Sequence, residues 1–268
     1  MDRKQLEKIK SRFTDYAAGF YGDDKFVNSN IKMKENHSRR TAAEMVLIAR
    51  AIGLDESGSY LAEVIGLLHD IGRFRQFSEY RTYTDNKSVN HSLLGSEILH
   101  DGDMIADLPD RERELIELAV KCHGARDLPE NVNGESLMFC KMVRDADKLD
   151  IYEVVLDFYA KYMRGEQDYE IETDLLDLPD KYSPEVVEMV ISGQPIDYDL
   201  MKCWNDIKLL QLGWVHDINF NFSLKQIKER DYLPQILNYL PDTPEIRIVG
   251  EKVFEYVDRR ISGEGKEF

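Results

Sequence analysis

The chain has 268 residues, of which 43% are hydrophobic and 32% charged, so it has room for one large globular domain or for a core with an extension. Its formal net charge of −16 excludes a broad basic surface, and we therefore expect no extended nucleic acid as a partner. No stretch approaches eighteen consecutive apolar residues, so we expect no membrane association.

Apolar residues recur mostly at helical spacing, and the alternation typical of strands is scarce. The fold class is therefore predicted as all-α. In chain order, the predicted helices cover residues 3–19, 37–53, 58–71, 91–100, 110–124, 135–163, 184–192, 199–211, 223–238 and 244–261. The polar and aromatic segment 74–90 lacks a helical stripe and is expected to be a loop.

Two parts are expected along the chain. Residues 1–165 are predicted to form one helical core, and residues 166–268 an acidic connector and a helical extension packed on that core. The extension could cap a site or mediate a homodimer. Three widely spaced cysteines, Cys122, Cys140 and Cys203, argue against a disulfide framework and favour a reducing cytoplasmic location.

One aspartate near residue 147 interrupts an apolar helical face. Asp147 is the only charge in a stripe at spacings of three and four, formed by Cys140, Val143, Asp147, Ile151, Val154 and Phe158. Asp145 falls instead on a mixed polar face, where we expect a solvated carboxylate. The periodicity therefore selects Asp147 as the inward-facing group.

Six polar side chains are predicted to face the interior, which is too large a polar set for a core without a purpose. They are His37, His69, Asp70, His91, His123 and Asp147. His69 and Asp70 end the apolar run VIGLLHDIGRF, where we expect Gly72 to end a helix and let the two side chains converge. Two further His-Asp pairs, at residues 100–101 and 216–217, are expected to be structural.

These residues stand in the contexts NHSRR, LLHDIGRF, NHSLLGSEIL, KCHG and DADKL, and the pattern over residues 30–160 resembles the HD superfamily of metal-dependent hydrolases. The resemblance implies a helical bundle with metal ions at its centre. Four histidines and two aspartates are similar to binuclear members, including the HD-GYP cyclic-dinucleotide phosphodiesterases. The chain departs from that group, because it has HDIGR in place of HDIGK and HGARDLP from His123 onward.

The resemblance implies roles for the six residues. His37, His69, Asp70 and Asp147 would hold one metal, and Asp70 would bridge to a second metal held by His91 and His123. Imidazole and carboxylate ligands suit Mn or Fe, with Zn, Co, Ni or Mg also compatible. The activity implied is hydrolysis of a phosphate ester, from a nucleotide or another small phosphorylated metabolite, by hydroxide bound between two divalent metals.

The segment after Asp70 supplies the predicted substrate contacts. Arg73 lies one turn past Asp70 and is expected to bind phosphate oxygens as a bidentate donor, which makes Asp70 and Arg73 the predicted catalytic residues. Residues 73–87 carry four basic and two acidic side chains, so a small phosphorylated substrate fits there. Further substrate contacts are expected from Arg75, Tyr80, Arg81, Tyr83 and Lys121.

Two other functions stay open on the same residues. Proteins of the HD fold that resemble myo-inositol oxygenase use four histidines and two aspartates to hold two irons and activate O₂. A non-catalytic module that senses a nucleotide is the second alternative. Turnover with Mn in the absence of oxygen separates the hydrolase from the oxygenase, and turnover of any kind separates both from the sensor.

Overall fold

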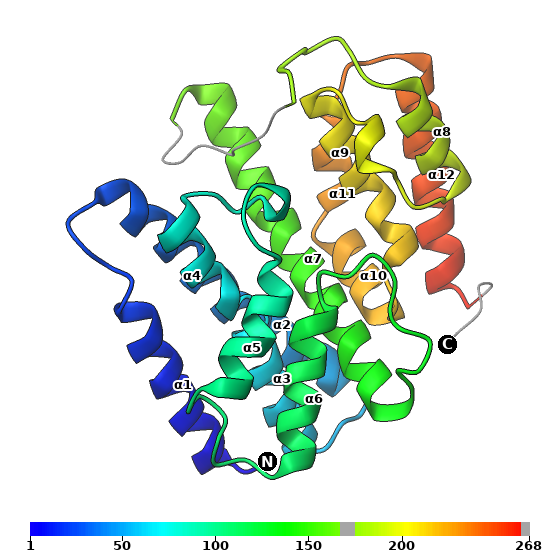
Figure 1. The fold of residues 1–268 in the computed structure, drawn as a ribbon. Helices are drawn as coiled ribbons and strands as arrows, with labels where there is room; N and C mark the ends of the chain where they lie inside the picture. The colour runs from blue at the N-terminus through cyan, green and yellow to red at the C-terminus, as the bar shows by residue number, and fades with distance from the viewer. Residues whose placement is uncertain (167–174, 264–268) are drawn as a thin grey trace. The chain divides into compact units, whose positions relative to one another are not determined.

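Helices make up the regular structure of residues 1–166 and 175–263, the part of the chain that the computed structural model describes (Figure 1). No β-strand forms within these residues, and one isolated bridge joins Leu176 to Cys203. The predicted all-α fold is therefore confirmed. None of the described helices is long and apolar enough to cross a membrane.

The chain forms two compact units that divide within one long helix, α7 (Gly134–Arg164), after Asp150. The first unit contains the start of α7 and α1 (Arg3–Ala18), α2 (Lys25–Ala51), α3 (Glu56–Leu68), α4 (Ile71–Tyr80), η1 (Asp85–Lys87), α5 (His91–Asp101) and α6 (Asp110–Cys122). The second contains the rest of α7 and α8 (Pro184–Ser192), η2 (Tyr198–Leu200), α9 (Trp204–Gly213), η3 (Trp214–Asp217), α10 (Asn221–Glu229), α11 (Tyr232–Leu237) and α12 (Pro244–Ile261).

The domain division expected between residues 165 and 166 stays a prediction, as does the homodimer. The acidic connector predicted to begin at residue 166 falls partly on residues 167–174, which lie outside the described residues.

Helix α2 begins twelve residues before the predicted start at residue 37. Asp24 caps it by accepting hydrogen bonds from the backbone N–H groups of Phe26 and Val27. Several buried positions of its first half are polar, among them Asn30, Glu35 and Ser38, so the hydrophobic stripe is interrupted there. Periodicity of apolar residues therefore missed this half of the helix.

The predicted loop at 74–90 is wrong in its first part, because α4 runs from Ile71 to Tyr80. Phe74 and Phe77 are buried at three-residue spacing from Ile71, which gives this short helix an apolar face. Helix α3 ends at Leu68, so residues 69 and 70 form a tight corner between two helices. Gly72 does not end a helix as predicted, since it lies inside α4.

Two glycines of the first unit allow helices to approach each other very closely. A Cβ atom on Gly72 would lie 2.2 Å from the carbonyl oxygen of His91 and 2.8 Å from the backbone nitrogen of Gly95, so α4 and α5 pack backbone to backbone. A Cβ atom on Gly66 would lie 2.7 Å from Ala42 Cα, which brings α3 equally close to α2. These contacts fix the helices on either side of the corner at residues 69 and 70.

The second unit has its own aromatic and polar core. Tyr152 is fully buried, stacks on Tyr232 with ring centroids 5.3 Å apart, and donates a hydrogen bond to the carbonyl of Gln211 at 2.7 Å. The predicted helix 223–238 is divided into α10 and α11 at Asp231, which has a φ of 54°. The predicted helix 199–211 starts only at Trp204, because η2 and extended residues precede it.

We predict that Gly72→Ala destabilises the protein by about 2 kcal/mol or more, because the new methyl group overlaps backbone atoms that cannot move independently. Chemical denaturation followed by circular dichroism measures the change. Gly22→Ala is the matched control, since nothing lies within 4 Å of a Cβ atom there, and it should shift stability by less than about 0.5 kcal/mol. Equal stability of the two variants would contradict the close packing of α4 on α5.

Candidate metal centre

The six predicted ligands come together in the first unit from separate elements. His37 lies within α2, His69 and Asp70 form the corner between α3 and α4, and His91 is the first residue of α5. His123 follows the last residue of α6, and Asp147 lies within α7. All are buried except Asp147, whose side chain is 20% exposed.

Four ligand atoms form a first cluster. His37 Nε2 lies 3.1 Å from His69 Nε2, 3.5 Å from Asp70 Oδ2 and 3.1 Å from Asp147 Oδ1. His69 Nε2 lies 3.7 Å from Asp70 Oδ2 and 3.5 Å from Asp147 Oδ1. Ligands about 2.1 Å from one ion are about 3.0 Å apart in an octahedron and about 3.4 Å apart in a tetrahedron. The spacing therefore fits a metal ion.

Three ligand atoms form a second cluster around the other oxygen of Asp70. Asp70 Oδ1 lies 3.6 Å from His91 Nε2 and 3.4 Å from His123 Nε2, and these two nitrogens are 3.1 Å apart. The sets His37, His69, Asp70 and Asp70, His91, His123 are thus each close enough to bind an ion. Asp70 directs one oxygen to each cluster, which is the geometry of a bridging carboxylate.

Hydrogen bonds at the opposite ring nitrogen orient all four imidazoles. His69 and His123 each directly follow a helix, and their Nδ1 atoms donate to the carbonyls of Gly66 and Val120, both at 2.7 Å. In His37 and His91, Nδ1 contacts carboxylates instead. An acceptor at Nδ1 keeps the proton there, so that the lone pair of Nε2 is available to a metal.

Each cluster contains one histidine supported by an aspartate and an arginine, and we name these the His–Asp–Arg series. In the first series, Asp150 Oδ2 lies 2.6 Å from His37 Nδ1, and Arg40 holds both Asp150 oxygens at 2.6 and 3.0 Å. In the second, Asp85 Oδ2 lies 2.8 Å from His91 Nδ1, and Arg73 Nη1 donates to Asp85 Oδ1 at 3.0 Å. The arginines neutralise the supporting aspartates.

The electrostatic environment keeps the aspartates ionised. Burial acts to raise the pKa of Asp70, but the Lys34 ammonium and His69 outweigh it and hold the pKa well below its usual range. Burial likewise opposes ionisation of Asp147, yet the adjacent imidazoles of His37 and His69 bring its pKa far down. Carboxylates of this kind are ready to bind cations near neutral pH.

The second His–Asp–Arg series lowers the pKa values of both its histidine and its aspartate. Burial lowers the pKa of His91 to about 4, although the hydrogen bond to Asp85 acts against this. Burial acts to raise the pKa of Asp85, but the His91 hydrogen bond and nearby Arg73 bring it to about 2. His91 is therefore neutral at pH 7, which is the form that binds a metal.

Arg73 is held by protein groups. Its side chain is 16% exposed, and Nη1 contacts Asp85 Oδ1, the carbonyl oxygen of Tyr83 and Gln76 Oε1. Nε lies 3.6 Å from Asp70 Oδ1. Arg73 therefore fastens residues 83–85 beside Asp70. Its predicted role in catalysis and phosphate binding stays a prediction.

The other predicted substrate contacts lie mostly on the surface. Arg75 pairs with Glu79 and Arg81 with Asp24, whereas Tyr80 and Lys121 are exposed. Lys121 lines a separate pocket of about 340 Å³ between α6 and the residues before α7. Tyr83 is turned inward, where its hydroxyl donates to the carbonyl of Asn30 at 3.0 Å. Substrate contact by these side chains stays a prediction.

The interpretation of Asp145 as solvated is wrong, because its exposed fraction is 0%. Three important residues were not identified from the sequence: Asp150, Asp85 and Lys34. Asp150 could have been identified from its spacing. It lies three residues after Asp147, and Arg40 lies at the same spacing after His37. Asp85 carried no such signal, because it begins η1, a helix too short to show a periodic pattern. Lys34 lay outside the predicted helix.

The remaining histidines lie apart from both clusters. His100 is 73% exposed at the side chain and pairs with Glu117 at 3.2 Å. His216 Nε2 contacts the carbonyl of Val190 at 3.2 Å, within the second unit. All three cysteines are buried free thiols.

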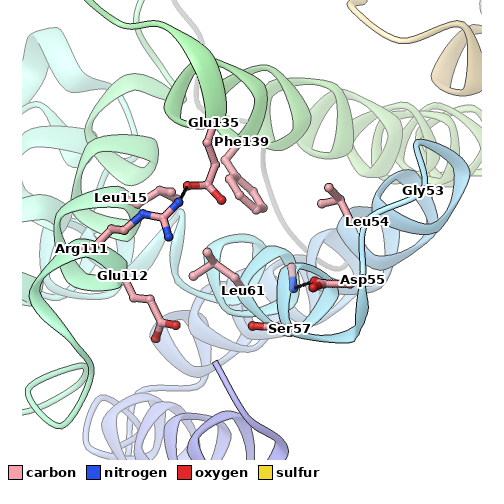
Figure 2. A pocket seen from close by; sticks show the side chains of 11 residues that line it. Gly53, Leu54, Asp55, Ser57, Leu61, Arg111, Glu112, Leu115, Glu135 and Phe139 are labelled. Atoms are coloured by element: carbon pink, nitrogen blue, oxygen red, sulfur yellow. Dashed lines mark hydrogen bonds and ion pairs between the residues drawn. The ribbon is translucent and has the colours of Figure 1, made fainter.

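A pocket of about 480 Å³ lies at the starts of α3, α6 and α7 and is lined by none of the six predicted ligands (Figure 2). Most of its polar groups have partners, although Glu112 Oε2 is buried without a hydrogen-bond partner among the described residues. Arg111 pairs with Glu135, Asp55 accepts the N–H of Gly58, and Glu112 accepts the N-terminal ammonium group. The pocket is therefore separate from the two clusters of predicted ligands.

We predict that Asp85→Asn weakens metal binding at the second cluster by about 10- to 100-fold, because the neutral amide supports His91 less well as a ligand. Titration with Mn²⁺ in competition with a chelating dye measures the change. Asp107→Asn is the matched control, since Asp107 is half exposed and pairs with Lys8. An unchanged affinity in Asp85→Asn would contradict the role of Asp85 in orienting His91.

We predict a pH-dependent stability of the metal-free protein that depends on His91. An unfolded histidine binds its proton near pH 6.5, whereas His91 in the folded state does so only near pH 4, so the free energy of unfolding falls as pH drops through this range. Between pH 7 and pH 5 the protein should lose about 2 kcal/mol more than the variant His91→Gln.

Urea denaturation in the presence of a chelator at both pH values tests this prediction. The exposed His100 provides the control, because His100→Gln should retain the pH dependence of the unchanged protein. A pH dependence in His91→Gln equal to that of the unchanged protein would contradict it.

Comparison with known protein families matches residues 35–183, more than half of the chain, to the HD domain. Comparisons with curated proteins and with solved structures find no match. The HD domain is a helical bundle found mostly in metal-dependent phosphohydrolases, and the clusters described above contain the residue types that bind divalent metals in it. The match confirms the resemblance drawn from the motifs, and this chain belongs to the HD domain family.

Proposed function

We propose that the protein is a binuclear metal-dependent phosphohydrolase that acts on a nucleotide or another small phosphorylated metabolite. The observation that carries the proposal is the orientation of Asp70, whose Oδ2 faces His37 and His69 while Oδ1 faces His91 and His123. A carboxylate shared in this way suits two ions rather than one.

The donor set fits divalent transition metals. Each cluster combines two imidazoles with carboxylate oxygen, a mixture that suits Mn or Fe and is compatible with Zn, Co or Ni. When bound, a pair of such ions lowers the pKa of water and polarises a phosphoryl oxygen for in-line displacement. The residues of the chain hold the ions at fixed positions, and the hydrogen bonds at each Nδ1 prevent the imidazoles from rotating away.

The charge of the centre favours an anionic substrate. Asp70 and Asp147 provide two negative charges, which two divalent ions exceed, whereas Asp85 and Asp150 are each paired with an arginine. The centre with its ions is therefore positively charged. A phosphate group is attracted to such a site, and this favours hydrolysis of a phosphate ester over oxidation of a neutral substrate on the same ligands.

We predict that the purified, metal-reconstituted protein carries two divalent ions per chain and that His91→Ala carries one, because the second cluster loses a ligand. Metal content by mass spectrometry measures this, and His100→Ala should leave the content at two. With Mn²⁺ and without oxygen, the unchanged protein should hydrolyse p-nitrophenyl phosphate or a member of a nucleotide panel. Asp70→Asn should lose this activity at least 100-fold.

The other outcomes separate the alternatives. Two irons with oxygen-dependent turnover and no hydrolysis would establish the oxygenase. One ion in both the unchanged protein and His91→Ala would leave a mononuclear centre. Ligand binding without turnover in a metal-replete sample would establish a sensor, and no metal after reconstitution would overturn the proposal.

A further inference from the structure

One cation beside the bridging carboxylate has no part in the roles assigned so far. Lys34 lies on α2, one turn before His37, and its Nζ donates a hydrogen bond to Asp70 Oδ2 at 2.8 Å. The side chain is only 16% exposed. Its other described contact is with the ring of Tyr83, whose centroid is 5.3 Å from Nζ. The family match begins at residue 35, so Lys34 lies just outside it.

The two arginines of the His–Asp–Arg series are less free to move toward a substrate. Arg40 is committed to both oxygens of Asp150. Nη1 of Arg73 is committed to Asp85 and the carbonyl of Tyr83, which holds the guanidinium in place although its Nε has no hydrogen-bond partner within the described part of the chain. Lys34 has a compact charge, three N–H donors and a flexible stem, and one of its donors is used by Asp70. It is therefore the cation of this centre that can change partners at least cost.

The partner of Lys34 is also a ligand of the first cluster. Asp70 Oδ2 lies 3.5 Å from His37 Nε2 and 3.7 Å from His69 Nε2. An ion bound there withdraws negative charge from Asp70 and places a like charge near the ammonium group. The ammonium then needs another anion, and a phosphate oxygen lying across the two ions provides one.

We propose that Lys34 binds a non-bridging oxygen of the substrate's phosphate group, and that in the metal-free protein it neutralises Asp70 and competes with the first ion. This inference rests on the proposed function, since it requires a metal centre that accepts phosphate. It assigns the substrate class to anionic phosphate compounds, because a neutral polyol would leave the ammonium without a counter-charge.

Calorimetric titration of inorganic phosphate into the Mn²⁺-loaded protein tests the first part. Lys34→Gln should weaken phosphate binding about 10-fold or more, as expected for loss of a charge-assisted hydrogen bond, and Lys34→Arg should retain most of the affinity. Lys32→Gln is the matched control, because Lys32 lies on the same helix, is 56% exposed and pairs with Glu35. It should bind phosphate within about twofold of the unchanged protein.

Titration with Mn²⁺ in the absence of phosphate tests the second part. Lys34→Gln should bind the first ion several-fold more tightly than the unchanged protein, because no ammonium competes for Asp70. A purely structural lysine would not produce this gain, since its loss would weaken the binding of both metal and phosphate. Lys32→Gln should bind Mn²⁺ as the unchanged protein does.

The outcomes distinguish this inference from the proposed function. If two Mn²⁺ ions bind and Lys34→Gln retains full phosphate affinity, the inference is wrong and the metal centre stands. If Lys34→Gln loses Mn²⁺ while Lys34→Arg keeps it, Lys34 positions Asp70 and does not compete with the ion, which also overturns the inference. If the unchanged protein binds no Mn²⁺, the proposed function fails and the inference falls with it.

Discussion

The structure of the first unit depends on one buried carboxylate. Asp70 is 3% exposed, and a carboxylate in such a place is unfavourable unless cations or hydrogen-bond donors surround it. Four imidazoles, Lys34 and Arg73 do so, and they come from α2, α4, α5 and the ends of α3 and α6. These five helices are therefore positioned with respect to this residue, whereas α7 reaches the centre through the contacts of Asp147 with His37 and His69.

The backbone makes that arrangement possible through small residues at helix contacts. Gly66 and Gly72 lie on either side of the corner that carries His69 and Asp70, and each removes a side chain that would separate two helices. The corner is consequently fixed from α2 on one side and from α5 on the other. His37 and His91, which belong to these two helices, reach different oxygens of the same carboxylate as a result.

The sequence alone was sufficient for the helical fold and for the six residues that converge, because inward-facing histidines and aspartates are conspicuous on apolar helical faces. It was insufficient where polar residues of the site interrupt the apolar pattern of a helix. Helix α2 was predicted too short because its buried turns are polar, and this concealed Lys34. Asp145 was misplaced because α7 is buried around more of its circumference than a single stripe indicates.

The same limit applies to the supporting residues. Asp85 begins η1, which is too short for periodicity to indicate which side chains turn inward, and its place is set by Arg73 and Gln76. Gly72 was predicted to end a helix because the conformational freedom of glycine makes it common at helix ends. In the structure its lack of a side chain matters instead, because this allows α4 to approach α5. Both errors concern contacts between two segments of the chain, and such contacts cannot be predicted from the sequence of one segment alone.

The ligands of the centre are spread over 111 residues of chain, from His37 to Asp147, and this has a consequence for folding. Ions held by such distant residues act as removable cross-links, because they bind the folded state and find no assembled site in the unfolded one. An ion present at 100 times its dissociation constant adds about 2.7 kcal/mol to the free energy of unfolding. On the proposed function, the equilibrium stability of the folded protein therefore depends on the supply of metal in its surroundings.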